Sequence, residues 1–248
     1  PEICANSAPM RKKQSRLILF FLLASFSLAI GLAACTTEKI NPHFELDSMR
    51  MATTNLVTSN GMTLPLRKWS PQGEPEAMIL ALHGFNDYSN AFSNPAEYWA
   101  KEGFLVYAYD QRGFGATSGA GRWPGTGVLM QDLLGMVALL RKIHPKIPLY
   151  LLGESMGGAL LIATSHHLPT ETISGIILVA PAVWARKTMP PMYIATLWLG
   201  AHIMPWLRLS GRGLKIQASD NRQMLLELVQ DPLVIKQTRI DTMYGLVN

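Results

Sequence analysis

The chain has 248 residues, of which 48% are hydrophobic and 16% are charged. That length suits one α/β domain, or one domain with an insertion, and the apolar content is ample for a packed core, so disorder is not the expected state. The net charge of +5 comes largely from residues 1–35, because the remainder carries 18 basic and 16 acidic side chains. This balance gives no reason to expect a nucleic-acid partner.

The N-terminal region has the composition of an export signal. Residues 1–9 precede a more plausible start at Met10 and are expected to be an upstream extension. Within residues 10–35, a basic stretch is followed by a long apolar stretch that ends in Leu-Ala-Ala-Cys35. This order is typical of a secretory signal peptide, and its end resembles the bacterial lipobox, in which the cysteine is lipidated. We therefore expect an exported lipoprotein held on a membrane through Cys35, in the outer membrane if the organism has one. The alternative is an uncleaved transmembrane anchor.

A polar, unpatterned stretch over residues 36–55 is expected to tether the lipid to the folded domain. The domain then opens with two strands, Leu56–Thr58 and Leu64–Trp69, which flank Asn60-Gly61. Because Asn-Gly readily adopts positive φ values, the pair predicts a hairpin with a two-residue turn.

An apolar strand over Ala77–Leu82 runs directly into His83-Gly84-Phe85. A glycine after a strand lets the backbone swing, so that the following N–H of Phe85 can point into a site. His83 ends a strand, so we expect it to form local hydrogen bonds and shape the loop, and not to act as a catalytic base. A helix is predicted over residues 90–101.

The next strand, Phe104–Tyr109, ends in a glycine-rich loop that begins Asp110-Gln-Arg112. Asp110 is a candidate for the acid of a catalytic triad. A carboxylate at the start of such a loop more often binds backbone amides and a nearby guanidinium, so we expect Asp110 and Arg112 to stabilise the loop together.

A buried strand over Leu149–Gly153 ends in Gly153-Glu-Ser155-Met-Gly157, after which residues 157–168 predict a helix. A serine at a sharp strand-to-helix turn exposes its hydroxyl above the sheet, and Gly153 and Gly157 are needed because a Cβ there would collide with neighbouring backbone. Ser155 is thus the candidate nucleophile.

Two main-chain N–H groups, those of Phe85 and Met156, are expected to face the Ser155 hydroxyl. Met156 follows the nucleophile at the start of a helix, where the helix dipole adds positive partial charge. Together they would stabilise an oxyanion.

Three motifs, His-Gly-Phe, Asp-Gln-Arg-Gly-Phe-Gly-x-x-Ser and Gly-Glu-Ser-Met-Gly-Gly, occur in this order and spacing. They resemble the monoacylglycerol lipase and lysophospholipase branch of the α/β-hydrolases. The resemblance implies a mostly parallel sheet with helices on both faces, a helical lid inserted after the sixth strand, and hydrolysis of lipid-like esters.

Later elements complete this scheme only in part. Residues 127–143 predict a helix and Gly175–Ala180 the sixth strand, so residues 56–182 would form the core. The alternation then stops, and residues 183–248, rich in Trp, Met and Pro, are expected to form a lid that contacts an acyl chain, or alternatively an ordinary packed helical subdomain.

A serine nucleophile needs a histidine base and an orienting carboxylate, which in this fold follow it in chain order. The only histidines after Ser155 are His166, His167 and His202, and none follows an apolar strand. We therefore expect a C-terminally truncated chain that lacks the last two strands, the triad acid and the triad base, and that is itself inactive.

The sequence thus predicts an exported serine hydrolase that cleaves monoacylglycerol or lysophospholipid esters through an acyl-enzyme. Metal-ligand and phosphate-loop motifs do not occur, so no metal or other cofactor is expected. One alternative is a peptidase or aryl esterase of the same fold. Another is a non-catalytic lipoprotein that retains the hydrolase shell to bind lipids or a partner.

Overall fold

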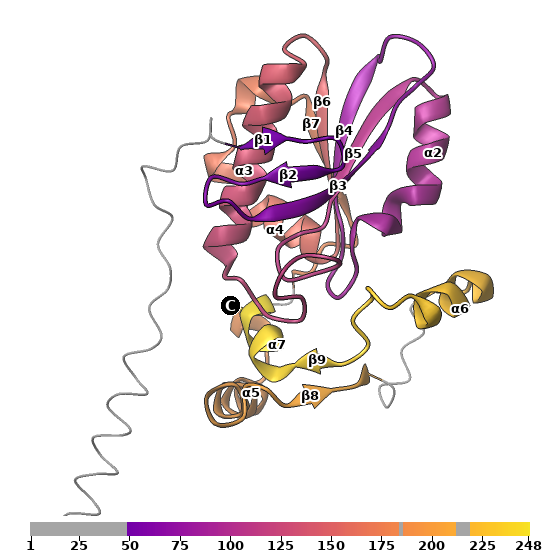
Figure 1. The fold of residues 1–248 in the computed structure, drawn as a ribbon. Helices are drawn as coiled ribbons and strands as arrows, with labels where there is room; N and C mark the ends of the chain where they lie inside the picture. The colour runs from indigo at the N-terminus through magenta and orange to yellow at the C-terminus, as the bar shows by residue number, and fades with distance from the viewer. Residues whose placement is uncertain (1–48, 184–185, 212–218) are drawn as a thin grey trace, which may run out of the picture. The chain divides into compact units, whose positions relative to one another are not determined.

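The computed structural model describes residues 49–183, 186–211 and 219–248 (Figure 1). The predictions for the upstream extension, the signal peptide, Cys35 and most of the tether therefore lie outside the described residues.

A seven-stranded sheet forms the centre of the protein, in the order β1-β2-β3-β5-β4-β6-β7. The strands β4, β5, β6 and β7 are mutually parallel, whereas β1, β2 and β3 join antiparallel. The bounds are β1 Arg50–Met51, β2 Asn55–Val57, β3 Thr63–Trp69, β4 Ala77–Leu82, β5 Phe104–Tyr109, β6 Leu149–Glu154 and β7 Gly175–Val179. All six residues of β4 are buried, as a continuous apolar run at the centre of a parallel sheet requires.

Helices cover both faces of this sheet (Figure 1). On one face, α2 (Ser93–Lys101) packs through Ala96 in a cluster with Ile79 and Leu152. On the other, α3 (Thr126–Ile143) and α4 (Met156–Thr164) contribute to the larger cluster. The predicted α/β fold, mostly parallel and with helices on both faces, is confirmed.

The opening of the domain differs from the sequence prediction in two ways. The sheet begins at Arg50, inside the expected tether, because Arg50 and Met51 pair with β2 and the neighbouring Met49 is buried in the core. The hairpin loop has five residues, since Val57 pairs with Thr63, and only Gly61 of the Asn-Gly pair has a positive φ. The predicted two-residue turn is therefore wrong.

The C-terminal segment, residues 183–248, holds short helices and a two-stranded sheet of β8 and β9. Its elements are a one-turn helix Arg186–Thr188, α5 Pro191–Ile203, β8 Arg208–Leu209, α6 Arg222–Gln230, β9 Thr238–Arg239 and α7 Ile240–Leu246. After α6 the chain turns at Asp231-Pro232 and then enters β9. Close contact between Gly200 and Ile240 joins α5 to α7.

The apolar side chains of this segment are mostly exposed: Met192 is 69% exposed and Trp206 is 63% exposed, although Met189 is buried. An ordinary packed subdomain would bury such side chains. The outermost strand of the described sheet, β7, is also exposed along its apolar residues 176–179. Within the described ranges, no helix is both long and apolar enough to cross a bilayer.

Candidate active site

Ser155 occupies the sharp turn between β6 and α4. Its backbone lies at φ 49° and ψ −109°, a region that non-glycine residues rarely occupy and that stores local strain. Three hydrogen bonds fix it there: its N–H donates to the Val179 carbonyl at 2.9 Å, and its carbonyl accepts from Ala159 at 3.0 Å and Ala182 at 2.9 Å. The side chain is half-buried and does not cap α4, so its hydroxyl is not engaged by the helix that it precedes.

The two flanking glycines permit this turn. A Cβ at Gly153 would lie 2.6 Å from the backbone of Gly157, and a Cβ at Gly157 would lie 2.2 Å from the carbonyl oxygen of Leu82. Both distances are far below any normal contact, so α4 can approach β4 and β6 only with glycine at these positions.

The loop after β4 lies against the nucleophile turn. A Cβ built on Gly84 would lie 3.5 Å from Ser155 Cβ and 3.8 Å from the Glu154 carboxyl group, so this loop lies beside the turn with room for little more than a methyl group between them. Phe85 packs edge-on against Phe114, with ring centroids 5.6 Å apart. Met156 is the first residue of α4, where free N–H groups and the helix dipole favour negative charge.

His83 is fully buried and both of its ring nitrogens are bonded. Nε2 accepts the Gln111 N–H at 2.9 Å, so Nδ1 carries the proton and donates to the Gly84 carbonyl at 2.8 Å. Burial lowers the pKa of His83 to about 4, although the Gly84 carbonyl and the Asp110 charge oppose the shift. His83 is thus a neutral group that ties the loop after β4 to the loop after β5.

Asp110 stabilises the loop after β5 and is itself buried. Its Oδ1 accepts from the N–H and hydroxyl of Ser89, at 3.1 and 2.5 Å, and its Oδ2 accepts from the Ala116 N–H at 2.9 Å. The expected ion pair between Asp110 and Arg112 is wrong. Arg112 instead forms a two-pronged pair with Asp132 of α3, with both N–O distances at 2.8 Å. Burial raises the pKa of Asp132, while the Arg112 guanidinium opposes the shift.

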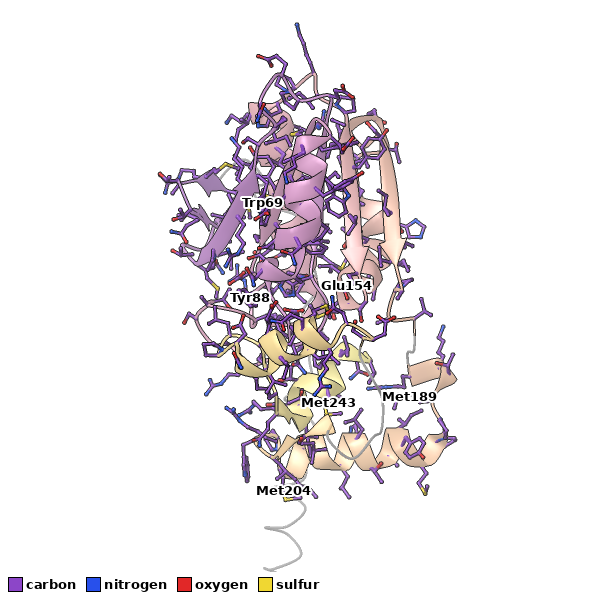
Figure 2. The ribbon with its side chains drawn as sticks, turned by 90° about the vertical axis from the view of Figure 1, so that its right-hand side faces the viewer. Trp69, Tyr88, Glu154, Met189, Met204 and Met243 are labelled. Atoms are coloured by element: carbon purple, nitrogen blue, oxygen red, sulfur yellow. The ribbon has the colours of Figure 1, made fainter. Side chains whose placement is uncertain are left out.

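A cavity of about 570 Å³ lies beside the nucleophile turn. Its walls include Leu152, Glu154 and Val179 from the sheet, residues 93–95 and Trp99 of α2, and Met224, Leu228 and Val234 of the C-terminal segment. Figure 2 shows Glu154 and Tyr88 at the end of the sheet that faces this segment. Burial, reinforced by the nearby Asp87 charge, raises the pKa of Glu154. The lining of the cavity combines apolar side chains with carboxyl groups.

Besides His83, two described histidines form hydrogen bonds, and their partners are residues other than Ser155. His144 bonds Tyr107 at 3.0 Å, and His202 bonds the Trp198 carbonyl at 2.7 Å and stacks on its ring. His166 and His167 lie exposed in a one-turn helix after α4. In residues 49–183, 186–211 and 219–248, no group of His, Cys, Asp and Glu side chains is arranged to hold a metal.

Sequence reasoning missed the bonds between the loop after β4 and the C-terminal segment. Asn86 Nδ2 donates to Thr238 Oγ1 at 2.6 Å, and the Tyr88 hydroxyl donates to Asp231 Oδ2 at 2.6 Å. The only sequence signal was Asn86 itself, a residue that tolerates positive φ, directly after Gly84-Phe85. The partners lie about 150 positions away and show no pattern.

The sheet order, the turn at Ser155 and the helices on both faces define an α/β-hydrolase fold. Solved structures agree: a monoacylglycerol lipase from Paleococcus ferrophilus has a TM-score of 0.58 at 22% identity, covering 74% of this chain and 68% of that chain. A soluble variant of monoglyceride lipase from Saccharomyces cerevisiae has a TM-score of 0.60 at 18% identity, covering 86% and 70%.

The family model described as "Serine aminopeptidase, S33" matches residues 73–248, and the chain belongs to this hydrolase family. Monoglyceride lipase of Rattus norvegicus is 35% identical over 133 residues, which is 53% of this chain and 44% of that protein. Monoacylglycerol lipase of Mycolicibacterium smegmatis is 29% identical over 136 residues, covering 54% and 48%. The matched region spans less than half the length of these curated relatives.

Proposed function

We propose that the protein is a serine hydrolase that cleaves carboxylic esters of lipid-like substrates, monoacylglycerols or lysophospholipids, through an acyl-enzyme on Ser155. The observation that carries this proposal is the strained backbone of Ser155 at the β6–α4 turn, beside the loop after β4. Such a strained turn is the usual setting of a hydrolase nucleophile. The monoglyceride lipase relatives support the substrate class.

In this mechanism, Ser155 Oγ attacks the ester carbonyl carbon while its proton passes to a general base. The carbonyl oxygen becomes an oxyanion, which accepts hydrogen bonds from the Phe85 and Met156 N–H groups. Collapse of the tetrahedral intermediate expels the alcohol, which takes the proton back, and leaves an acyl group on Ser155. Water, deprotonated by the same base, then attacks the acyl carbonyl carbon, and the fatty acid leaves as Ser155 Oγ takes the proton back. Loss of one oxyanion donor commonly lowers kcat by about 10²- to 10³-fold.

The base and its orienting carboxylate are a separate part of the proposal. His83 cannot serve as the base, because the Gln111 N–H occupies the lone pair of Nε2, Nδ1 is bonded to the Gly84 carbonyl, and a pKa of about 4 makes the buried ring a weak proton acceptor. Asp110 already accepts three hydrogen bonds, two from Ser89 and one from the Ala116 N–H of its own loop. In α/β-hydrolases both triad partners follow the nucleophile in chain order, so we propose that the base and the acid are residues other than His83 and Asp110.

Fatty acid release from 1-monoacylglycerol and from lysophospholipid, by the complete protein and by its Ser155→Ala variant, tests this function. We expect hydrolysis of at least one substrate and a loss of about 10⁴-fold or more in the variant. Equal turnover by both proteins would contradict the assignment of Ser155.

A second candidate function is favoured by the family description and by the cavity. Asp87, Glu154, Glu227 and Asp231 all line the cavity beside the nucleophile turn, and carboxylates attract the protonated amine of a peptide N-terminus. Faster turnover of amino-acid p-nitroanilides than of monoacylglycerol would favour a peptidase. Absence of both activities in the complete protein would favour a non-catalytic binding shell.

We also propose that residues 10–35 direct export and that Cys35 carries the lipid anchor. The support is the order of basic, apolar and small residues that ends at this cysteine. Metabolic labelling with palmitate should mark the protein, and Cys35→Ala should abolish the label. Labelling that survives the substitution would contradict the anchor.

A further inference from the structure

The loop after β4 carries one of the two proposed oxyanion donors on a turn of unusual conformation. The Asp87 N–H donates to the Gly84 carbonyl at 3.3 Å, so Phe85 and Asn86 are the two central residues of the turn. Asn86 has φ of 67°, as the third position of a type II turn requires. Asparagine tolerates this conformation better than most residues, but a positive φ still costs it more than it costs glycine, so contacts with neighbouring structure stabilise the turn.

The neighbouring structure here is residues 231–238 of the C-terminal segment. The Ile235 N–H donates to the Asn86 carbonyl at 2.9 Å, and Asn86 Nδ2 donates to Thr238 Oγ1 at 2.6 Å. Thr238 is buried in β9, so its hydroxyl is held in place by the strand. Two bonds from one segment thus fix both the main chain and the side chain of Asn86.

A third bond holds the end of the same loop. The Tyr88 hydroxyl donates to Asp231 Oδ2 at 2.6 Å, while Asp231 Oδ1 accepts the Leu233 N–H at 2.8 Å. Burial, together with the Asp231 carboxylate, raises the pKa of Tyr88 to about 12, so this donor keeps its proton at neutral pH. Figure 2 shows Tyr88 at the boundary between the sheet and the C-terminal segment.

We propose that Asn86 and Thr238 are positioning residues, through which residues 231–238 hold the turn that presents the Phe85 N–H. The inference rests on the proposed function, because it assumes that the Phe85 N–H is an oxyanion donor and that these bonds fix its direction. When residues 231–238 leave the loop, Asn86 loses the bonds that hold its left-handed backbone, and the Phe85 N–H loses its fixed direction. Covalent chemistry at Ser155 then slows even though substrate still binds.

The test inactivates the complete protein with a fluorophosphonate, whose phosphoryl oxygen occupies the oxyanion hole. It measures the maximal inactivation rate constant, kinact, and the inhibitor concentration at half that rate, KI. Thr238→Val and Asn86→Gly remove the same hydrogen bond, so each should lower kinact about fivefold with KI unchanged, and the double variant should lower it no further. Asn86→Ala should lower kinact more than Asn86→Gly, because alanine also resists positive φ.

Thr242→Val is the matched control. Thr242 is a buried threonine of the same segment whose hydroxyl bonds a core loop elsewhere, at the Gly121 carbonyl, 2.9 Å away. It should lower thermal stability about as much as Thr238→Val and leave kinact within twofold. Unchanged kinact in Thr238→Val, or an equal loss in Thr242→Val, would overturn the inference.

Hydrogen exchange separates this inference from the proposed function. Amides of residues 84–88 should exchange faster in Thr238→Val than in the native protein, and at the native rate in Thr242→Val. Equal exchange in both variants would overturn the inference whether or not the protein is active. Labelling of the native protein that does not depend on Ser155 would instead overturn the proposed function.

Discussion

Replacement of Gly157 by alanine tests the packing that creates the nucleophile turn. The new Cβ would lie 2.2 Å from the Leu82 carbonyl oxygen and 2.7 Å from its carbon. Both are backbone atoms at the end of β4, so they cannot rotate away as a flexible side chain could. The N-terminal turn of α4 must therefore move off the sheet.

The size of the effect follows from two opposing contributions. Overpacking a tight contact costs about 3 kcal/mol when the neighbour is backbone, whereas alanine is favoured over glycine within a helix by about 1 kcal/mol. The expected net loss is about 2 kcal/mol, which lowers Tm by about 4–8 °C for a domain of this size. A shift of the helix start also moves the Met156 N–H, and a displacement near 1 Å costs about 100-fold in rate.

Thermal unfolding by circular dichroism and ester hydrolysis by the complete protein measure the two effects. Gly73→Ala is the control, because a Cβ there meets nothing within 4 Å, and it should change neither quantity. Gly84→Ala should be tolerated in stability, since its nearest neighbour lies at 3.5 Å. A Gly157→Ala protein with the native Tm would refute this account of the turn.

Two further predictions concern buried charge. Burial lowers the pKa of His83 to about 4 from its usual 6.5, so the free energy of unfolding should be constant above pH 6.5 and fall by about 3 kcal/mol as the pH drops to 4. Urea denaturation at several pH values measures this dependence, and His83→Gln should remove it. A dependence that persists in the variant would contradict the assignment to His83. Arg112→Met leaves the Asp132 carboxylate buried and unpaired, so it should lower the free energy of unfolding by about 3 kcal/mol. Adding Asp132→Leu should restore most of this loss. A further, additive loss in the double variant would show that the two residues are not coupled.

The core of the fold and the nucleophile turn could be predicted from sequence because each has a local signal. Continuous apolar runs mark β4, β5 and β6, and Gly153 and Gly157 mark a turn that only glycine allows. The loop role of His83 follows from its place directly after a strand. Its neutral tautomer was not predictable, because that depends on Gln111, which another loop supplies.

The failures at the candidate site share one physical cause, which is pairing between distant residues. Asp132 lies within an amphipathic helix and resembles a surface acid, yet it is buried because Arg112 reaches it from the loop after β5. Proximity in sequence suggested Asp110 as the partner of Arg112, but backbone amides already satisfy that carboxylate. The bond from Asn86 to Thr238 had no sequence signal, since hydroxyl and amide side chains carry no periodicity.

The central claim is that Ser155 is the nucleophile. The most direct measurement is mass spectrometry of the complete protein after reaction with a fluorophosphonate, with the modified peptide sequenced. The proposed mechanism predicts one phosphonyl group on Ser155 and no adduct in Ser155→Ala. An adduct on another residue, or an equal adduct in the variant, would contradict it.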